Sequence, residues 1–293
     1  MPCTPVTTGP EKLLKNSVIR VGGKMGQKLK NGDSINFETL LRVAINIPGV
    51  KINREEFLTS ALEPYFERSV IRNAVATNPA CAGIGQEDIR KIADASIKYE
   101  TNKATAISFA AGLPGGLAMV GTIPMDLAQY FGHVLRILQK LIYLYGWQEL
   151  FNNKEIQIDD ETANLLTLFM GVMFGVNGAS NAIAKLADSA AQKTVKVIAQ
   201  KALTKGTVYP VVKKVSLALG VKMTRDIFAK SVSKVIPVIG GIASGGLTYA
   251  TYSPMARKLR DHLSKLKFAD VHFYAEMAQE ERGENVVWNQ EPC

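Results

Sequence analysis

Five polar residues recur at regular spacing on one apolar segment, and their types suit the binding of an anionic ligand. They lie in the run MDLAQYFGHVLRILQKLIYLYGW at successive steps of 3, 4, 3 and 4 residues: Asp126, Gln129, His133, Arg136 and Lys140. On an α-helix this spacing places all five on one face. One interpretation is the solvated face of an amphipathic helix. The other is an inward face that lines a cavity or a buried polar network, where His133 and Arg136 would contact an anion.

The same residues do not make a catalytic group. No second carboxylate stands at a useful spacing, no Ser or Cys nucleophile stands beside a base, and HxxR is not a metal-ligand motif. The three cysteines, Cys3, Cys81 and Cys293, contain no CxxC pair, so they indicate neither a zinc site nor a disulfide framework and favour a reducing compartment. We therefore predict no catalytic residue, no metal and no cofactor, and we favour a function other than catalysis.

A second group of candidate residues comes from the distribution of positive charge. The formal net charge is +9, and residues 185–234 alone hold eleven Lys or Arg against two acids. A basic amphipathic helix is typical of proteins that lie on an anionic membrane, although an ordinary solvated face is the plainer interpretation. Nucleic acid is a less favoured anion because only Tyr209 and Phe228 could stack on bases there. The residues predicted to bind an anionic surface are Lys193, Lys196, Lys201, Lys205, Lys213, Lys214, Lys222 and Arg225.

Glycines gather in three uncharged runs at residues 104–125, 162–184 and 235–256, which are 22, 23 and 22 residues long. Each is long enough to cross a bilayer, for which about 20 residues suffice. Their prolines and small polar residues instead favour buried central helices of a bundle, with bilayer insertion as the alternative. The run GLPGGLAMVGTIPM lacks the lysine, the hydroxyl residue and the preceding strand of a phosphate-binding loop. We expect close helix packing at Gly112, Gly115, Gly116, Gly171, Gly175, Gly240, Gly241, Gly245 and Gly246.

Two of the glycine-rich segments are similar to each other. Residues 115–125 (GGLAMVGTIPM) align without gaps to residues 245–255 (GGLTYATYSPM) with five identities in eleven positions. A segment carrying His133 follows the first copy, and one carrying His262 follows the second. This predicts two Gly/Pro-rich helical hairpins related by a pseudo-two-fold axis, and chance similarity is the alternative.

The wider pattern predicts an all-α protein that forms a large helical bundle. Apolar residues recur at the helical period, and no segment alternates convincingly with period two. Asn53 is a suitable N-cap, and Gly146 a suitable C-terminal stop. The helices are expected at 35–47, 54–75, 86–112, 124–145, 159–191 (one helix or a broken pair), 193–205, 211–219, 224–235 and 254–268. We assign 1–33 to a flexible basic arm, 34–268 to a single helical domain and 269–293 to a polar tail in which Trp288 could dock.

The run LPGGLAMVGTIPMDLAQYFGHVLRILQKLIYLYGW, followed later by VIPVIGGIASGG, resembles the EcsC family of bacterial proteins. The shared features are a Gly/Pro-rich apolar turn, a helix that begins Pro-x-Asp-Leu and closes on Tyr-Gly, and a later Pro-Val-Ile-Gly-Gly segment. The similarity covers about residues 54–267. It implies an all-α fold and a bacterial cytoplasmic or membrane-peripheral setting, and it brings no catalytic residue set.

The sequence therefore predicts a non-enzymatic, membrane-associated helical protein that binds anionic lipid through a lysine-rich face and is linked to transport or secretion. Because the N-terminus has no apolar secretory segment, we expect it in the cytoplasm or peripheral on the inner membrane. A second hypothesis is a soluble small-molecule-binding protein or enzyme whose pocket is lined by Asp126, Gln129, His133 and Arg136. A third is an interaction protein that binds a protein partner through its termini.

Overall fold

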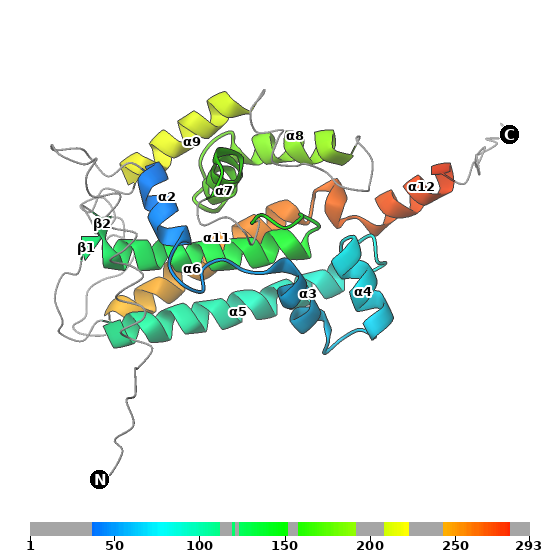
Figure 1. The fold of residues 1–293 in the computed structure, drawn as a ribbon, viewed down its shortest axis with the longest axis horizontal. Coiled ribbons are helices and arrows are strands. Elements are labelled where there is room, and N and C mark those ends of the chain that lie inside the picture. The colour runs from blue at the N-terminus through cyan, green and yellow to red at the C-terminus, as the bar shows by residue number, and fades with distance from the viewer. Residues whose placement is uncertain are drawn as a thin grey trace, which may run out of the picture.

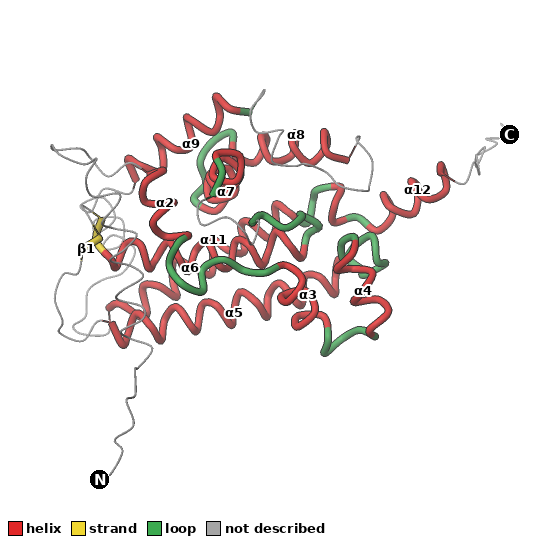
Figure 2. Tube along the Cα trace, viewed as in Figure 1, coloured by secondary structure: helices red, strands yellow, loops and turns green. Residues whose placement is uncertain are grey.

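A computed structural model of the chain describes residues 37–111, 119–120, 123–151, 158–191, 208–222 and 243–281 (Figure 1). These residues confirm the all-α bundle, and Figure 2 shows helices joined by short loops. The exception is a two-residue antiparallel ladder between β1 (Met119–Val120) and β2 (Ile123–Pro124), in which Met119 pairs with Pro124. The described part of the chain therefore has one fold class, with a minimal β element directly before a long helix.

The centre of the fold is a layer of three long helices. They are α5 (Gln86–Ala111), α6 (Met125–Leu144) and α11 (Ala243–Leu263), and each packs against the other two (Figure 1). Helix α2 (Phe37–Ile45) packs on α6, while α3 (Arg54–Leu62) and α4 (Arg68–Ala76) lie near the start of α5. On the other side, α7 (Asp160–Met173) packs against α8 (Ala179–Ala191), α9 (Tyr209–Lys222) and α11. The chain continues through a 3-10 turn (Lys267–Ala269) to α12 (Val271–Glu281), a helix within the predicted polar tail.

The end of α6 fixes a large aromatic residue in the core. Gly146 has φ +93, a conformation that favours glycine, and a Cβ there would lie 2.8 Å from the carbonyl oxygen of Phe268. The next residue, Trp147, is fully buried. Its ring meets Phe169 edge-on at 4.9 Å between centroids and Phe268 at 5.5 Å. The predicted stop at Gly146 is thus confirmed, and it joins α6, α7 and the 3-10 turn in one core.

Two predicted helices are each divided in two by their backbone chemistry. Asn53 caps α3 as predicted, its side chain accepting from the Glu56 N–H at 2.8 Å, but that helix ends at Leu62 rather than Val75. Pro64 stands two residues after Leu62, and a proline lacks the N–H that would continue the helix. The second predicted helix is the broken pair α7 and α8. It separates at Gly175 and Gly178, which have φ +68 and +91.

Glycine packing is confirmed at one predicted position and is of another kind at a second. A Cβ on Gly171 would lie 2.6 Å from Val215 Cγ1 of α9 and 2.9 Å from Ala179 Cβ of α8, so only glycine permits this approach. Gly175 instead serves the turn between α7 and α8. Gly112, Gly115, Gly116, Gly240 and Gly241 lie outside the described residues, as do the helices predicted over 193–205 and 224–235.

The second glycine-rich segment differs from the predicted hairpin. Residues 245–255, including Gly245 and Gly246, lie inside α11, which begins at Ala243 rather than at 254 and carries Pro254 within it. The aligned positions of the first segment are extended at Met119–Val120 and Ile123–Pro124. The two segments therefore have different conformations where both are described. No helix among the described residues has the length and hydrophobicity needed to cross a membrane.

Candidate functional site

The polar stripe of α6 faces a buried carboxylate on the neighbouring helix α5. Glu100 has a fully buried side chain and receives hydrogen bonds from Arg136, whose Nη2 is 2.9 Å from Oε1 and whose Nε is 3.0 Å from Oε2. Lys140 Nζ lies 2.7 Å from Oε1 of the same carboxylate. Such two-pronged, charge-assisted contacts are among the stronger polar contacts in proteins. At Arg136 and Lys140 the stripe is therefore inward-facing and forms an ion network.

Each charge in this network has further partners. Burial alone would raise the pKa of Glu100, but the hydrogen bonds and positive charges of Arg136 and Lys140 hold it below the usual value. Arg136 also donates to the Gly49 carbonyl, and the Lys140 ammonium lies over the rings of Phe57 and Tyr99, 5.3 and 5.1 Å from their centroids. Both cations of the stripe are thus already engaged by the protein.

The rest of the stripe is only partly described. His133 is half-buried, and burial lowers its pKa. Its Nδ1 is buried and makes no hydrogen bond with a described residue. Its carbonyl accepts from the Tyr252 hydroxyl of α11. Gln129 is half-buried one turn before His133, and the side chain of Asp126 lies outside the described residues. The sequence analysis did not single out Glu100, although its position indicates burial. It lies at helical spacing from the apolar residues Ile97 and Ala104, and both of these are buried on the same face of α5.

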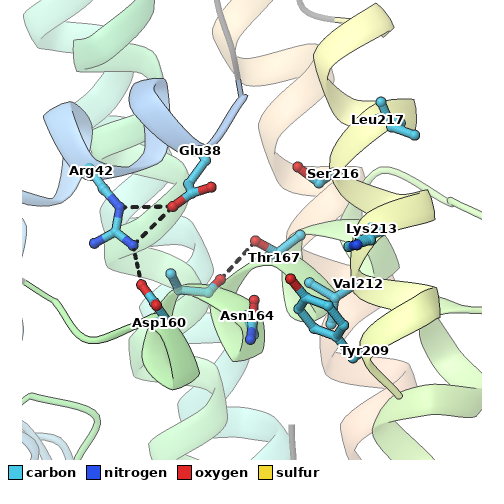
Figure 3. A pocket seen from close by; sticks show the side chains of 11 residues that line it. Glu38, Arg42, Asp160, Asn164, Thr167, Tyr209, Val212, Lys213, Ser216 and Leu217 are labelled. Atoms are coloured by element: carbon cyan, nitrogen blue, oxygen red, sulfur yellow. Dashed lines mark hydrogen bonds and ion pairs between the residues drawn. The ribbon is translucent and has the colours of Figure 1, made fainter. Parts of the chain in front are cut away.

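A pocket of about 580 Å³ lies away from this stripe, between α2, α7 and α9 (Figure 3). Its described lining does not include Gln129, His133 or Arg136 of the predicted ligand site. On one side, Arg42 Nη2 lies 3.0 Å from Glu38 and 2.6 Å from Asp160, and its Nη1 donates to the Ile158 carbonyl at 2.8 Å. The lining residues are Glu38, Arg42, Asp160, Ala163, Asn164, Thr167, Tyr209, Val212, Lys213, Ser216 and Leu217.

The other side of the pocket is formed by α9. The Lys213 ammonium lies 5.1 Å from the centre of the Tyr209 ring, and it makes no ion pair with any described residue. The Ser216 hydroxyl and the Asn164 amide also border the pocket, and within the described part of the chain neither makes a hydrogen bond. These polar groups are available to a molecule in the pocket, unlike the two cations Arg136 and Lys140 of the α6 stripe.

Helix α9 also carries an exposed outer surface. Val212, Val215 and Leu219 are buried against the fold, whereas Leu217 is 72% exposed and Tyr209 43% exposed. Lys213 and Lys214 are exposed beside them, and the helix contains no acidic residue. We call Tyr209, Lys213, Lys214 and Leu217 the α9 face. Of the other residues predicted to bind an anionic surface, Lys222 lies in α9, but its side chain is not described. Outside the described residues are Lys193, Lys196, Lys201, Lys205 and Arg225.

Comparison of the chain with protein-family models, with curated proteins and with solved structures finds no match. The resemblance to the EcsC family stays a prediction from its motifs. Within the described ranges, no group of three or more His, Cys, Asp or Glu side chains is arranged to hold a metal ion. The geometry therefore offers two sites for binding, the α9 face and the adjoining pocket.

Proposed function

We propose that this chain is a non-enzymatic, membrane-associated helical protein that binds anionic lipid through the α9 face. The observation that carries the proposal is the exposure of Leu217 between two lysines. At about 3.6 residues per turn, Leu217 lies between Lys213 and Lys214 on the helix circumference. An exposed leucine flanked by cations, on a helix without acids, has the pattern of a surface that inserts an apolar side chain among anionic head groups.

The expected affinity is modest and depends on salt. A lysine near an anionic surface contributes about 1 kcal/mol, and full burial of a leucine side chain contributes about 1.5–3 kcal/mol. In the sequence, residues 192–207 connect α8 to α9. This segment contains four lysines, which add positive charge next to α9 in the sequence. Helix α9 is on the outside of the fold, on the side away from α5 (Figure 1). The resemblance to the EcsC family supports a bacterial inner membrane as the setting, with a link to transport or secretion.

Vesicle flotation tests this proposal. At low ionic strength the full chain should float with vesicles of phosphatidylcholine and phosphatidylglycerol and stay behind with phosphatidylcholine alone. Lys213→Glu/Lys214→Glu should remove most of the bound fraction, because it reverses both cations of the α9 face. Lys98→Glu/Lys103→Glu is the matched control: both lysines are exposed on α5, and the change in net charge is the same.

Two results would contradict the proposal. One is a chain that stays in the soluble fraction with anionic vesicles at low salt. The other is an equal loss of binding in the two double variants, which would show that total charge matters and the α9 face does not.

A further inference from the structure

The pocket between α2, α7 and α9 has two carboxylates and an arginine on one side and a lysine on the other (Figure 3). On the side of α2 and α7, the carboxylates of Glu38 and Asp160 both contact the guanidinium of Arg42. Asp160 is 81% exposed and contacts Arg42 through Oδ1. On the α9 side, the Lys213 ammonium has no ion pair with a described residue. The pocket therefore presents the exposed carboxylate of Asp160 on one side and the Lys213 ammonium on the other.

Hydrogen-bonding groups accompany the two charges. Tyr209 and Ser216 offer hydroxyl groups on the same helix as Lys213, and Asn164 offers an amide from α7. None of these three side chains makes a hydrogen bond within the part of the chain that the structure describes. A cation with two hydroxyl donors suits an anion that has several oxygens, such as a phosphate. The carboxylate of Asp160 suits a group that donates N–H bonds.

We infer that this pocket binds a small zwitterion in which a primary ammonium and a phosphate are joined by a short linker, the chemistry of phosphoethanolamine. The phosphate lies against Lys213, Ser216 and Tyr209, and the ammonium lies against Asp160. A quaternary ammonium fits less well, because it donates no hydrogen bond and prefers a cage of aromatic rings. Among the described residues that line this pocket, only Tyr209 is aromatic. The volume of about 580 Å³ is within the range of small-molecule sites.

This chemistry has two sources: the head group of phosphatidylethanolamine and the free compound. Tyr209, Lys213 and Leu217 belong both to the pocket and to the α9 face. A membrane that contacts the α9 face would thus bring its head groups to the pocket. The lipid form of the inference rests on the proposed function, whereas binding of the free compound does not.

Calorimetric titration of the full chain with phosphoethanolamine tests the inference directly. We expect saturable binding that Lys213→Gln weakens about tenfold, the effect of losing one charge-assisted contact. Asp160→Asn should weaken binding to a similar degree. Because the Asp160 side chain is 81% exposed, this substitution should leave the chain folded, so weaker binding would report the loss of the carboxylate. The matched control is Lys214→Gln, the neighbouring lysine that does not line the pocket, which should change the affinity less than about twofold. Phosphocholine should bind more weakly than phosphoethanolamine.

Vesicles separate the two sources. Phosphatidylethanolamine and phosphatidylcholine are both neutral overall, so replacing part of the second by the first in anionic vesicles changes the head group and not the charge. Stronger flotation with phosphatidylethanolamine, lost in Lys213→Gln and kept in Lys214→Gln, supports the lipid source. Binding of the free compound without this preference assigns the pocket to a soluble ligand.

The inference is overturned if phosphoethanolamine gives no saturable binding, or if Lys213→Gln and Lys214→Gln weaken it equally. Flotation with anionic vesicles that persists in either case leaves the proposed function standing. Conversely, binding of the free compound by a chain that floats with no vesicle supports the pocket and contradicts the proposed function.

Discussion

Among the described residues, Glu100 is the one carboxylate that pairs with Arg136 and Lys140 of the α6 stripe, and its side chain is fully buried. Removing one member of a buried ion network leaves the others desolvated and unpaired. We therefore expect Glu100→Gln to lower the free energy of unfolding by about 3–5 kcal/mol, measured by urea denaturation. Glu87→Gln is the control, because the Glu87 carboxylate is on the same helix but is 83% exposed and pairs with Lys91, which is also exposed. This substitution should lower the free energy of unfolding by less than about 1 kcal/mol. Equal losses would contradict the buried network.

At the scale of elements, Gly171 sets how closely α7 approaches α9 and so supports both the pocket and the α9 face. An alanine Cβ there would lie 2.6 Å from Val215 Cγ1, closer than two carbons can approach. We expect Gly171→Ala to lower the free energy of unfolding by about 1–3 kcal/mol, because the added methyl group overpacks the contact and displaces α9. Urea denaturation measures this loss as a lower midpoint. Adding Val215→Ala should restore part of the loss by removing the clashing methyl groups. Gly85→Ala, where a Cβ has open space, should change stability little. A loss in Gly171→Ala that Val215→Ala leaves unchanged would argue against this contact.

The elements also show which parts of the fold the sequence could predict. The Asn53 cap, the stop at Gly146 and the break between α7 and α8 follow from local backbone preferences, and all three are present. The predicted start of α11 at Pro254 is wrong, because α11 begins at Ala243 and contains Pro254. Proline is favoured in the first turn of a helix, which suggested the start, but tertiary packing can also hold a proline within a helix. The partner of Arg136 and Lys140 could not be predicted, since Glu100 is brought to them by packing between helices. The pocket could not be predicted for the same reason: Arg42 and Asp160, which pair at its edge, are 118 positions apart in the sequence.

At the scale of the whole molecule, two half-buried histidines make stability depend on pH. Burial lowers the pKa of His133 and of His262 below the usual value near 6.5. Their unfolded forms therefore take up protons first on acidification. The stability that the two neutral imidazoles contribute is fully present above about pH 6.5 and is lost as the pH falls through their folded pKa values. Glu100 contributes in a more acidic range, because its pKa in the folded chain lies below the value of about 4.3 for an unfolded Glu. The stability that its ionised form provides is lost as the pH falls from about 4.3 through the folded pKa.

The histidine contribution can be isolated with variants. Urea denaturation between pH 7 and pH 5 should show stability falling by up to about 1.4 kcal/mol per pH unit for each proton taken up on unfolding. His133→Gln should make this slope shallower, because it removes one of the two half-buried imidazoles. The free energy of unfolding of this variant at neutral pH measures the cost of the substitution itself, apart from the pH dependence. His272→Gln is the matched control, since His272 is exposed on α12 and should leave the slope unchanged. If His133→Gln and His272→Gln gave the same slope as the unaltered chain, the desolvation of the His133 imidazole would not be what makes the fold sensitive to acid.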